Sequence, residues 1–276
     1  MNKINFTKMV AAGNDFVVVE ARKPQAINYK KLAIAICNRK FGIGADGLLI
    51  LGKSSRADVR MRIFNADGSE AEMCGNGARC AALYKAQGAR HLHVRQAGKA
   101  QVNIETKAGI IKSVINGNKV KIRLTEPKDL KLDLAVKLGR AMRVNFINTG
   151  VPHAVVFVDS LEKIDVFFLG RQLRFHKIFA PKGANVDFVE IVSPDKIKVR
   201  TYERGVEDET LACGTGVTAS ALVSAVKLGR FCSNDISVST KSGETLKVYF
   251  KFRLNKFSDV WLEGKVNTIC QGVYHV

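Results

Sequence analysis

The chain has 276 residues, 46% of them hydrophobic and 25% charged, which suits one or two globular domains with sizeable cores. No apolar run is long enough to cross a bilayer, and Ala12-Gly-Asn-Asp15 interrupts the N-terminal apolar stretch, so we expect a cytoplasmic protein that makes no membrane contact. Six cysteines without a Cys-x-x-Cys pair or a secretory signal favour free thiols over a zinc site or a disulfide framework.

The net charge of +19 is also compatible with a protein that binds nucleic acid through contacts to its phosphates. Lys and Arg are, however, spread along the chain, and where they are dense, as in Lys119–Leu124, they alternate with apolar residues. Such alternation is typical of the exposed face of a strand. We therefore favour a solvated basic surface and keep nucleic-acid binding as the non-enzymatic alternative.

In chain order, the first half predicts strands, one amphipathic helix and a second helix that follows a cysteine. Lys3–Val19 reads as two strands around a turn, and Tyr29–Arg39 as a helix that carries Cys37 in the core. Strands are expected next at Leu48–Leu51 and Val59–Phe64. The proline-free, Ala-rich run from Cys74 to Gly88 then predicts a helix, in which Cys80 is a core residue.

The second half repeats this plan after short strands, a hairpin turn at Asn116-Gly-Asn118 and a linker candidate at Thr125–Lys128. A basic amphipathic segment precedes another cysteine-led helix, which ends near Leu228 and carries Lys227 as its only charge. A helix that is apolar nearly all round must be buried, so we expect strands wrapped around it. The strands predicted in this half are Val144–Ile147, Ala154–Val158, Phe188–Val192, Lys198–Tyr202, Leu246–Phe252 and Val260–Leu262.

The two cysteine motifs are part of a repeat that covers the chain. Glu72-Met-Cys74-Gly-Asn-Gly77 matches Leu211-Ala-Cys213-Gly-Thr-Gly216, with a cysteine offset of 213 − 74 = 139. Three further blocks match in the same order at nearly the same offset, and they begin at Gly13 and Gly150, Gly44 and Gly183, and Thr106 and Thr240. A period this long predicts two similar domains and not a solenoid.

The expected fold is therefore α/β of the α+β type, with two structurally similar domains from an internal duplication. Each domain is predicted to be a curved β-sheet around a central helix, with the active site in the interdomain cleft. The predicted boundaries are residues 1–127 for the N-terminal domain and 128–264 for the C-terminal domain, and the closing strand of the first is sought in residues 265–276.

Paired thiols at two helix starts predict proton transfer. Inverting a carbon that bears hydrogen requires a base on one face and an acid on the other, and the reverse reaction exchanges the two roles. Cys74 and Cys213 supply two like groups, and we expect each thiol pKa to be brought toward neutrality by its helix start. The free N–H groups of the same turns would bind a substrate carboxylate.

Beyond the cysteine motifs, the chain resembles the diaminopimelate epimerases, which belong to the cofactor-independent amino-acid racemases. The motifs that carry the resemblance span nearly the whole chain and are Gly13-Asn14-Asp-Phe, Phe41-Gly-Ile-Gly-Ala-Asp46, Phe64-Asn65-Ala-Asp-Gly-Ser69, Cys74-Gly75-Asn76-Gly-Ala-Arg79, Pro152-His153, Asn185, Tyr202-Glu203-Arg204-Gly205 and Ala212-Cys213-Gly214-Thr215-Gly216. This chain has Val151 where some members of the family have Asn.

The resemblance implies interconversion of LL- and meso-diaminopimelate, in lysine and peptidoglycan precursor biosynthesis, by an isomerase that needs no pyridoxal phosphate, other cofactor or metal. It also implies a homodimer that acts on a small amino acid. The catalytic residues would be Cys74, Cys213, His153 and Glu203. The substrate-binding residues would be Asn14, Asn65, Gly75, Asn76, Asn185, Glu203, Arg204, Gly214 and Thr215.

Two other enzyme families remain as alternatives. Proline-racemase-like enzymes also use two cysteines, but the contexts of Asn65–Ser69 and Tyr202–Gly205 favour the diaminopimelate enzymes. Phenazine-biosynthesis-type isomerases share the fold but lack the thiol pair, so Cys74 and Cys213 count against them.

Overall fold

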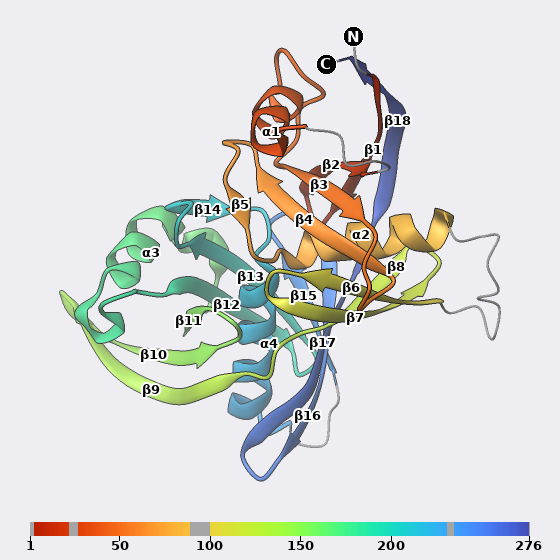
Figure 1. Cartoon of the computed structure of the whole chain (residues 1–276). Coiled ribbons are helices and arrows are strands. Elements are labelled where there is room, and N and C mark those ends of the chain that lie inside the picture. The colour runs from red at the N-terminus through yellow and green to blue at the C-terminus, as the bar shows by residue number, and fades with distance from the viewer. Residues whose placement is uncertain (1–2, 22–26, 89–99, 231–234, 276) are drawn as a thin grey trace. The chain divides into compact units, whose positions relative to one another are not determined.

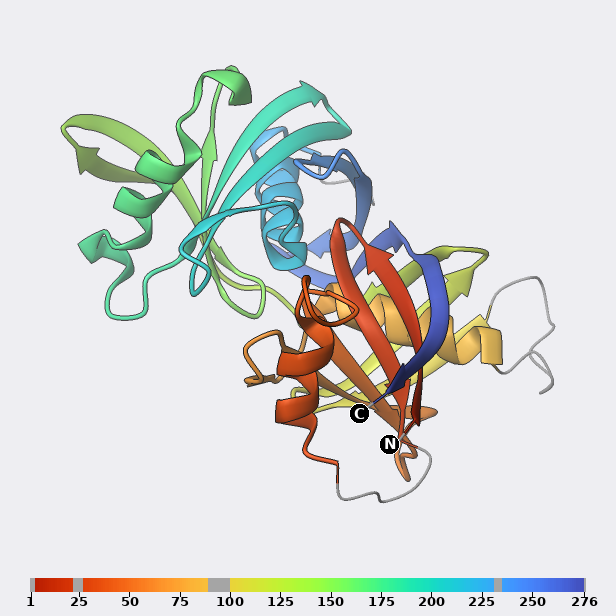
Figure 2. The same cartoon turned by 90° about the horizontal axis from the view of Figure 1, so that it is seen from above.

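The computed structural model describes residues 3–21, 27–88, 100–230 and 235–275, and the chain divides into two compact units. Unit 1 comprises residues 1–122 and 264–276, and unit 2 comprises residues 123–263. Both units combine many strands with two α-helices, as Figure 1 shows for the chain and Figure 2 from a second direction. Within the described residues, no helix combines the length and the apolar character that a membrane span requires.

Unit 1 is built on a mixed sheet. The strand β1 pairs antiparallel with β2, β2 runs parallel to β3, and β3 pairs antiparallel with β4, which in turn runs parallel to β6. The last strand, β18, returns to pair antiparallel with β1. The elements are β1 (Lys3–Ala11), β2 (Asn14–Glu20), α1 (Tyr29–Cys37), β3 (Gly47–Gly52), β4 (Val59–Asn65), β5 (Glu70–Ala71), α2 (Gly75–Gly88), β6 (Ala100–Thr106), β7 (Gly109–Asn116), β8 (Lys119–Arg123) and β18 (Asn267–His275).

Unit 2 has the same order of pairings. Its strand β10 pairs antiparallel with β9 and β11, β11 runs parallel to β12, and β12 pairs antiparallel with β13, which runs parallel to β15. The elements are β9 (Lys128–Leu138), β10 (Arg140–Asn148), β11 (Pro152–Phe157), η2 (Leu161–Lys163), α3 (Val166–Arg174), η3 (Lys177–Phe179), β12 (Asn185–Ser193), β13 (Lys196–Glu203), β14 (Asp208–Thr210), α4 (Gly214–Lys227), β15 (Asp235–Thr240), β16 (Thr245–Arg253) and β17 (Lys256–Lys265), whose last two residues fall in unit 1.

In each unit the sheet lies between two helices, because alternate side chains of a strand point to opposite faces. In unit 1, Leu48 and Ile50 pack with α1 in one core, whereas Leu49 faces Gly77 of α2. In unit 2, Val186 and Phe188 join α3 in one core, and the residue between them faces α4. The helices α2 and α4 each contact six strands of their own unit, as predicted for central helices.

Most sequence-predicted elements lie where the patterns place them. Both cysteine-led helices form, and the hairpin turn at Asn116–Asn118 joins β7 to β8. Cys37 and Cys80 are buried, as expected for core thiols, and burial raises the pKa of Cys37 to about 12. The strand predicted at Val144–Ile147 lies within β10, but β9 and its hairpin with β10 were not predicted, because most side chains of β9 are exposed and lack an apolar periodicity.

The strand before each cysteine is tied down by an arginine–glutamate–lysine cluster. In unit 1, Arg62 binds Glu70 in a bidentate pair, with N–O distances of 2.8 and 3.1 Å, and Lys107 adds a third contact at 2.8 Å. In unit 2, Arg200 binds Glu209 at 2.6 and 2.8 Å, and Lys241 lies 2.9 Å from the same carboxylate. Each cluster fixes the short strand that leads into a cysteine turn.

We expect these clusters to make stability depend on acid. The hydrogen bond from Arg62 lowers the pKa of Glu70 from 4.5 to about 2, and the pKa of Glu209 is also lowered, because Arg200 and Lys241 outweigh its burial. A carboxyl group whose pKa is lower in the folded than in the unfolded state stabilises the protein at pH values above its unfolded-state pKa. This stabilisation is lost as the pH falls through the folded-state pKa. Glu70→Gln should therefore destabilise the protein at neutral pH by about 1.5–3 kcal/mol, the range for hydrogen bonds to charged groups.

Thermal denaturation of the full chain as a function of pH measures this effect. The deficit of Glu70→Gln should shrink as the pH falls below the ordinary glutamate value of 4.5 and vanish near the folded-state pKa of about 2. The deficit of its counterpart Glu209→Gln should shrink in the same direction, because the pKa of Glu209 is also lowered. Glu162→Gln, at an exposed position, is the matched control and should change little. A deficit that is constant over the whole pH range would contradict the prediction.

Candidate functional site

Cys74 immediately precedes α2 and closes its first turn. The backbone N–H of Ala78 donates to the Cys74 carbonyl at 2.8 Å, and the thiol is half-buried, 3.8 Å from Asn14 Oδ1. The same amide oxygen accepts a hydrogen bond from Asn76 Nδ2 at 3.4 Å. The predicted site residues Asn14, Cys74 and Asn76 thus lie together at the start of α2, and Gly75 separates the last two in the sequence.

Asn14 is held from its other side by an ionic cluster. Its Nδ2 donates to Asp46 Oδ2 at 2.7 Å, and Arg39 binds both Asp46 and Asp15. Burial alone would raise the pKa of Asp15, but hydrogen bonds from Arg39 and Lys8 lower it to about 2. This cluster orients the Asn14 amide with its oxygen toward Cys74, a role that sequence analysis did not assign to either aspartate.

Asn65 does not join this group of contacts. It ends β4, is exposed, and donates through Nδ2 to Ser69 Oγ at 2.9 Å. Ser69 in turn donates to Asp67 at 2.6 Å, so the predicted substrate-binding amide is part of an ordered turn.

Cys213 occupies the N-cap of α4. The Val217 N–H donates to its carbonyl at 2.8 Å, and its Sγ lies 3.3 Å from Thr215 Oγ1. The helix start is tight, because a Cβ on Gly214 would lie 3.2 Å from Leu262. The sulfur therefore faces the first turn of a buried helix, as the sequence predicted.

The expectation of a lowered thiol pKa is wrong for Cys213. Burial raises its pKa well above the ordinary value of 9.0, and the charges of Glu203 and Asp187 act in the same direction. The Thr215 hydroxyl and the Gly216 N–H, which belong to the helix start, lower it by less. The sequence predicted the helix start, and the family resemblance named Glu203 as a site residue, but neither pointed to the fully buried Asp187 carboxyl group near the sulfur.

His153 links Cys213 to a third partner that sequence analysis missed. The ring is fully buried, with Nε2 2.9 Å from Thr215 Oγ1 and 3.3 Å from Asn185 Nδ2. Its Nδ1 lies 2.7 Å from Asp187 Oδ2, and Asp187 is also fully buried. An acidic residue inside the apolar run Val186-Asp-Phe-Val189 is the sequence signal that could have identified it.

Glu203 and Arg204 point to different partners. Burial raises the pKa of Glu203, and the Thr210 side chain and the neighbouring His153 act in the opposite direction by less. The backbone N–H of Arg204 donates to Asn185 Oδ1 at 2.7 Å, and its guanidinium donates to the Lys182 carbonyl at 3.3 Å. Glu203 is thus near the thiol and imidazole, and Asn185 is held from both ends of its amide.

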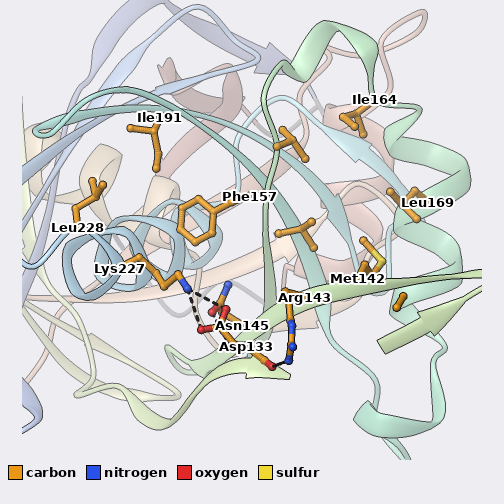
Figure 3. Close-up of a pocket in the computed structure, with 13 residues that line it drawn as sticks. Asp133, Met142, Arg143, Asn145, Phe157, Ile164, Leu169, Ile191, Lys227 and Leu228 are labelled. Carbon is orange, nitrogen blue, oxygen red and sulfur yellow. Dashed lines mark hydrogen bonds and ion pairs between the residues drawn. The ribbon is translucent and has the colours of Figure 1, made fainter. Parts of the chain in front are cut away.

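A pocket of about 570 Å³ in unit 2 lies elsewhere. Figure 3 shows its apolar side chains, among them Phe157, Ile191 and Leu228, with the ion pair between Lys227 and Asp133 at one side. None of the predicted site residues lines it. We therefore place the candidate site residues at the helix starts after Cys74 and Cys213 and not in this pocket. The thiol, amide, imidazole and carboxyl groups described above lie near these helix starts.

Two matched glycines should respond differently to an added methyl group. A Cβ on Gly216 would lie 2.3 Å from Asp187 Oδ1, whereas a Cβ on Gly77 would lie 3.1 Å from the flexible end of Leu49. Gly216→Ala should therefore destabilise the protein by about 1–3 kcal/mol, as overpacking does. Gly77→Ala should be nearly neutral, because alanine favours the helix by about 1 kcal/mol. Denaturant unfolding of both variants tests this, and equal destabilisation would contradict it.

Comparison with known proteins adds to this geometry. The family model described as diaminopimelate epimerase matches residues 6–129 and 145–252. A diaminopimelate epimerase of Aquifex aeolicus is 43% identical over 281 residues, which cover 98% of this chain and 97% of the relative. A relative from Chlorobaculum tepidum with the same description is 40% identical and covers 96% of this chain and 98% of its own length.

Solved structures share the fold at much lower identity. The hydroxyproline epimerase of Agrobacterium vitis, with bound trans-4-hydroxy-L-proline, aligns with a TM-score of 0.71 at 16% identity, and covers 98% of this chain and 92% of its own. A phenazine biosynthesis protein of the PhzF family from Bacillus anthracis aligns over both complete chains with a TM-score of 0.72 at 19% identity. These likenesses show a mixed α/β fold. The full-length matches in sequence show that the chain belongs to the diaminopimelate epimerase family.

Proposed function

We propose that this chain interconverts LL- and meso-diaminopimelate by moving a proton at one α-carbon between Cys74 and Cys213. The observation that carries the proposal is the pair of thiols, each placed at the first turn of a central helix and each in contact with a polar side chain. The two relatives that match over nearly the full length are both described as diaminopimelate epimerases. An acid and a base of the same kind suit a reaction that runs in both directions.

The proposal includes an internal duplication, which the common order of strand pairings and the paired arginine–glutamate–lysine clusters support. Each half contributes one thiol to the same carbon, which requires the two halves to form a shared cleft around the substrate. Closure of such a cleft would exclude water from the carbanion-like transition state.

The helix starts are suited to hold the substrate carboxylate next to the reacting carbon. Backbone N–H groups at the first turns of α2 and α4, after Gly75 and Gly214, have no intrahelical acceptor and favour negative charge. Charge that develops on the carboxylate as the α-carbon loses its proton is stabilised by the same donors. We assign the distal part of the substrate to the remaining polar residues, Asn65, Asn185 and Arg204.

Replacing either thiol tests the two-base mechanism. Cys74→Ser and Cys213→Ser should each lower the rate of meso-diaminopimelate formation from the LL epimer by about 10²–10⁴-fold, because a hydroxyl is too weak an acid to replace the thiol. In deuterated water, the wild-type product should carry one deuteron at the inverted α-carbon. Chiral chromatography with mass detection follows both quantities.

Cys270→Ser is the matched control, because this thiol is exposed on β18 and lies outside the proposed site, and the variant should keep wild-type activity. A product without deuterium would exclude proton exchange at the α-carbon. Turnover of L-proline instead of diaminopimelate would favour a proline-racemase-like enzyme.

We also propose a homodimer, an expectation that follows from the family resemblance. Light scattering on the protein as it elutes from a size-exclusion column should then give a mass of twice the chain's 30.3 kDa. A mass of one chain at micromolar concentration would contradict it.

A further inference from the structure

Asp187, the residue that pairs with His153, is acidic, whereas the residue at the corresponding position of unit 1, Leu49, is apolar. On β12, Asp187 pairs across the sheet with Thr201 of β13, and both face α4. On β3, Leu49 pairs with Ile63 of β4 in the same register, and both face α2. An apolar pair therefore suffices to pack the helix against the sheet.

Unit 2 places a buried carboxylate at that position, which is costly unless its oxygens are bonded. Asp187 Oδ1 accepts from Thr201 Oγ1 at 2.7 Å, and Oδ2 lies 2.7 Å from His153 Nδ1. Both oxygens have a partner, so the carboxylate fits the site. A packing role alone does not explain its presence, since hydrophobic residues fill the corresponding place in unit 1.

The tautomer of His153 follows from the hydrogen bonds around it. The Arg204 N–H needs an acceptor, and Asn185 Oδ1 provides it at 2.7 Å. The amide nitrogen of Asn185 then faces His153 Nε2 at 3.3 Å, so Nε2 must accept. The ring proton is therefore on Nδ1, from which it is donated to Asp187.

A continuous hydrogen-bonded path joins this ring to the thiol. Thr215 Oγ1 lies 2.9 Å from His153 Nε2 and 3.3 Å from Cys213 Sγ. The path is directional, because Nε2 accepts from the threonine hydroxyl and the hydroxyl can accept from the thiol.

We propose that Asp187 is a positioning residue that fixes the Nδ1–H tautomer of His153 and stabilises the imidazolium formed when Cys213 loses its proton. The thiol proton passes to Thr215 Oγ1 as the hydroxyl proton passes to Nε2. The products are a thiolate, an intact threonine hydroxyl and an imidazolium, with no change in net charge. The inference rests on the proposed catalytic use of Cys213.

Among the residues that the structure describes, three ionisable groups lie near His153 and decide whether this transfer is favourable. They are Asp187 from β12, Glu203 from β13 and Cys213 at the start of α4. With a neutral imidazole, burial and the carboxyl groups keep the thiol protonated, as the raised pKa of Cys213 shows. The internal transfer avoids this barrier, because the cation it creates lies between the thiolate and Asp187.

Nuclear magnetic resonance of the full-length protein, with isotope-labelled histidine, tests the tautomer without substrate. The chain has five histidines, and the signals that disappear in His153→Gln assign this ring. We expect a protonated Nδ1 and an unprotonated Nε2 in the neutral wild-type ring. A proton on Nε2 would overturn the proposal, whatever the variants show.

Asp187→Asn tests the electrostatic part. Loss of the charge should raise the fraction of neutral His153 rings that carry the proton on Nε2, because an asparagine amide can donate to Nδ1 whereas the carboxylate can only accept. It should also reduce kcat for LL-diaminopimelate by about 10- to 1,000-fold with little change in KM, since a carboxylate that orients a catalytic histidine can contribute up to about 10⁴-fold. Asp195→Asn, on an exposed turn of the same unit, is the matched control and should change neither quantity.

Two further variants separate positioning from folding. Thr201→Val removes the hydroxyl that holds Asp187 and should cause a smaller loss of kcat in the same direction, while Thr201→Ser should restore it. In a His153→Gln background, Asp187→Asn should cost less than about twofold, because coupled residues are not additive. A full additional loss, or an unchanged tautomer of His153 in Asp187→Asn, would overturn the inference. Inactive wild-type protein with the expected tautomer would instead reject the proposed function alone.

Discussion

The buried helix at the centre of each unit is the constraint on which the rest of the structure depends. Strands contact α4 on all sides, so its polar backbone groups are free to act only where the helix begins. The Cys-Gly-x-Gly motif lies at that end in both units, where small residues let the sheet and neighbouring side chains approach closely. The same tight turn thus lets the helix pack closely against the sheet and places the thiol at the start of the helix.

The two thiols have different chemical surroundings despite their common scaffold. Cys74 contacts the amide oxygen of Asn14, which the Asp46 carboxylate and Arg39 hold in place. An amide cannot take up a proton near neutral pH, so this contact orients the thiol. Cys213 contacts a hydroxyl that leads to an imidazole and a buried carboxylate, a path that can store a proton. The two thiols therefore occupy like positions at helix starts but have polar partners that differ in acid–base behaviour.

Sequence patterns predicted the strands, the central helices and the helix-start cysteines because these depend on local periodicity and turn chemistry. Glycine spacing around Cys74 and Cys213 is visible without any knowledge of long-range contacts. The environment of the sulfur was not predictable in this way. Asp187 lies 26 residues before Cys213 in the sequence (213 − 187), and its approach depends on the pairing of β12 with β13 beneath α4. For this reason the helix start was foreseen and the raised pKa of Cys213 was not.

The cross-strand pair beneath each central helix is a position at which the two units differ in chemistry. Leu49 with Ile63 and Asp187 with Thr201 occupy the same register on matching strands, and each pair lies under a glycine of the Gly-x-Gly turn. In unit 1 the apolar pair contributes core burial, whereas in unit 2 the polar pair gives up that burial and gains contact with His153. A polar substitution in a core persists where it supports function, since packing alone favours the hydrophobic pair. At this position unit 1, with Leu49, therefore has a packing contact alone, whereas unit 2 has the polar pair of Asp187 and His153 beneath its helix.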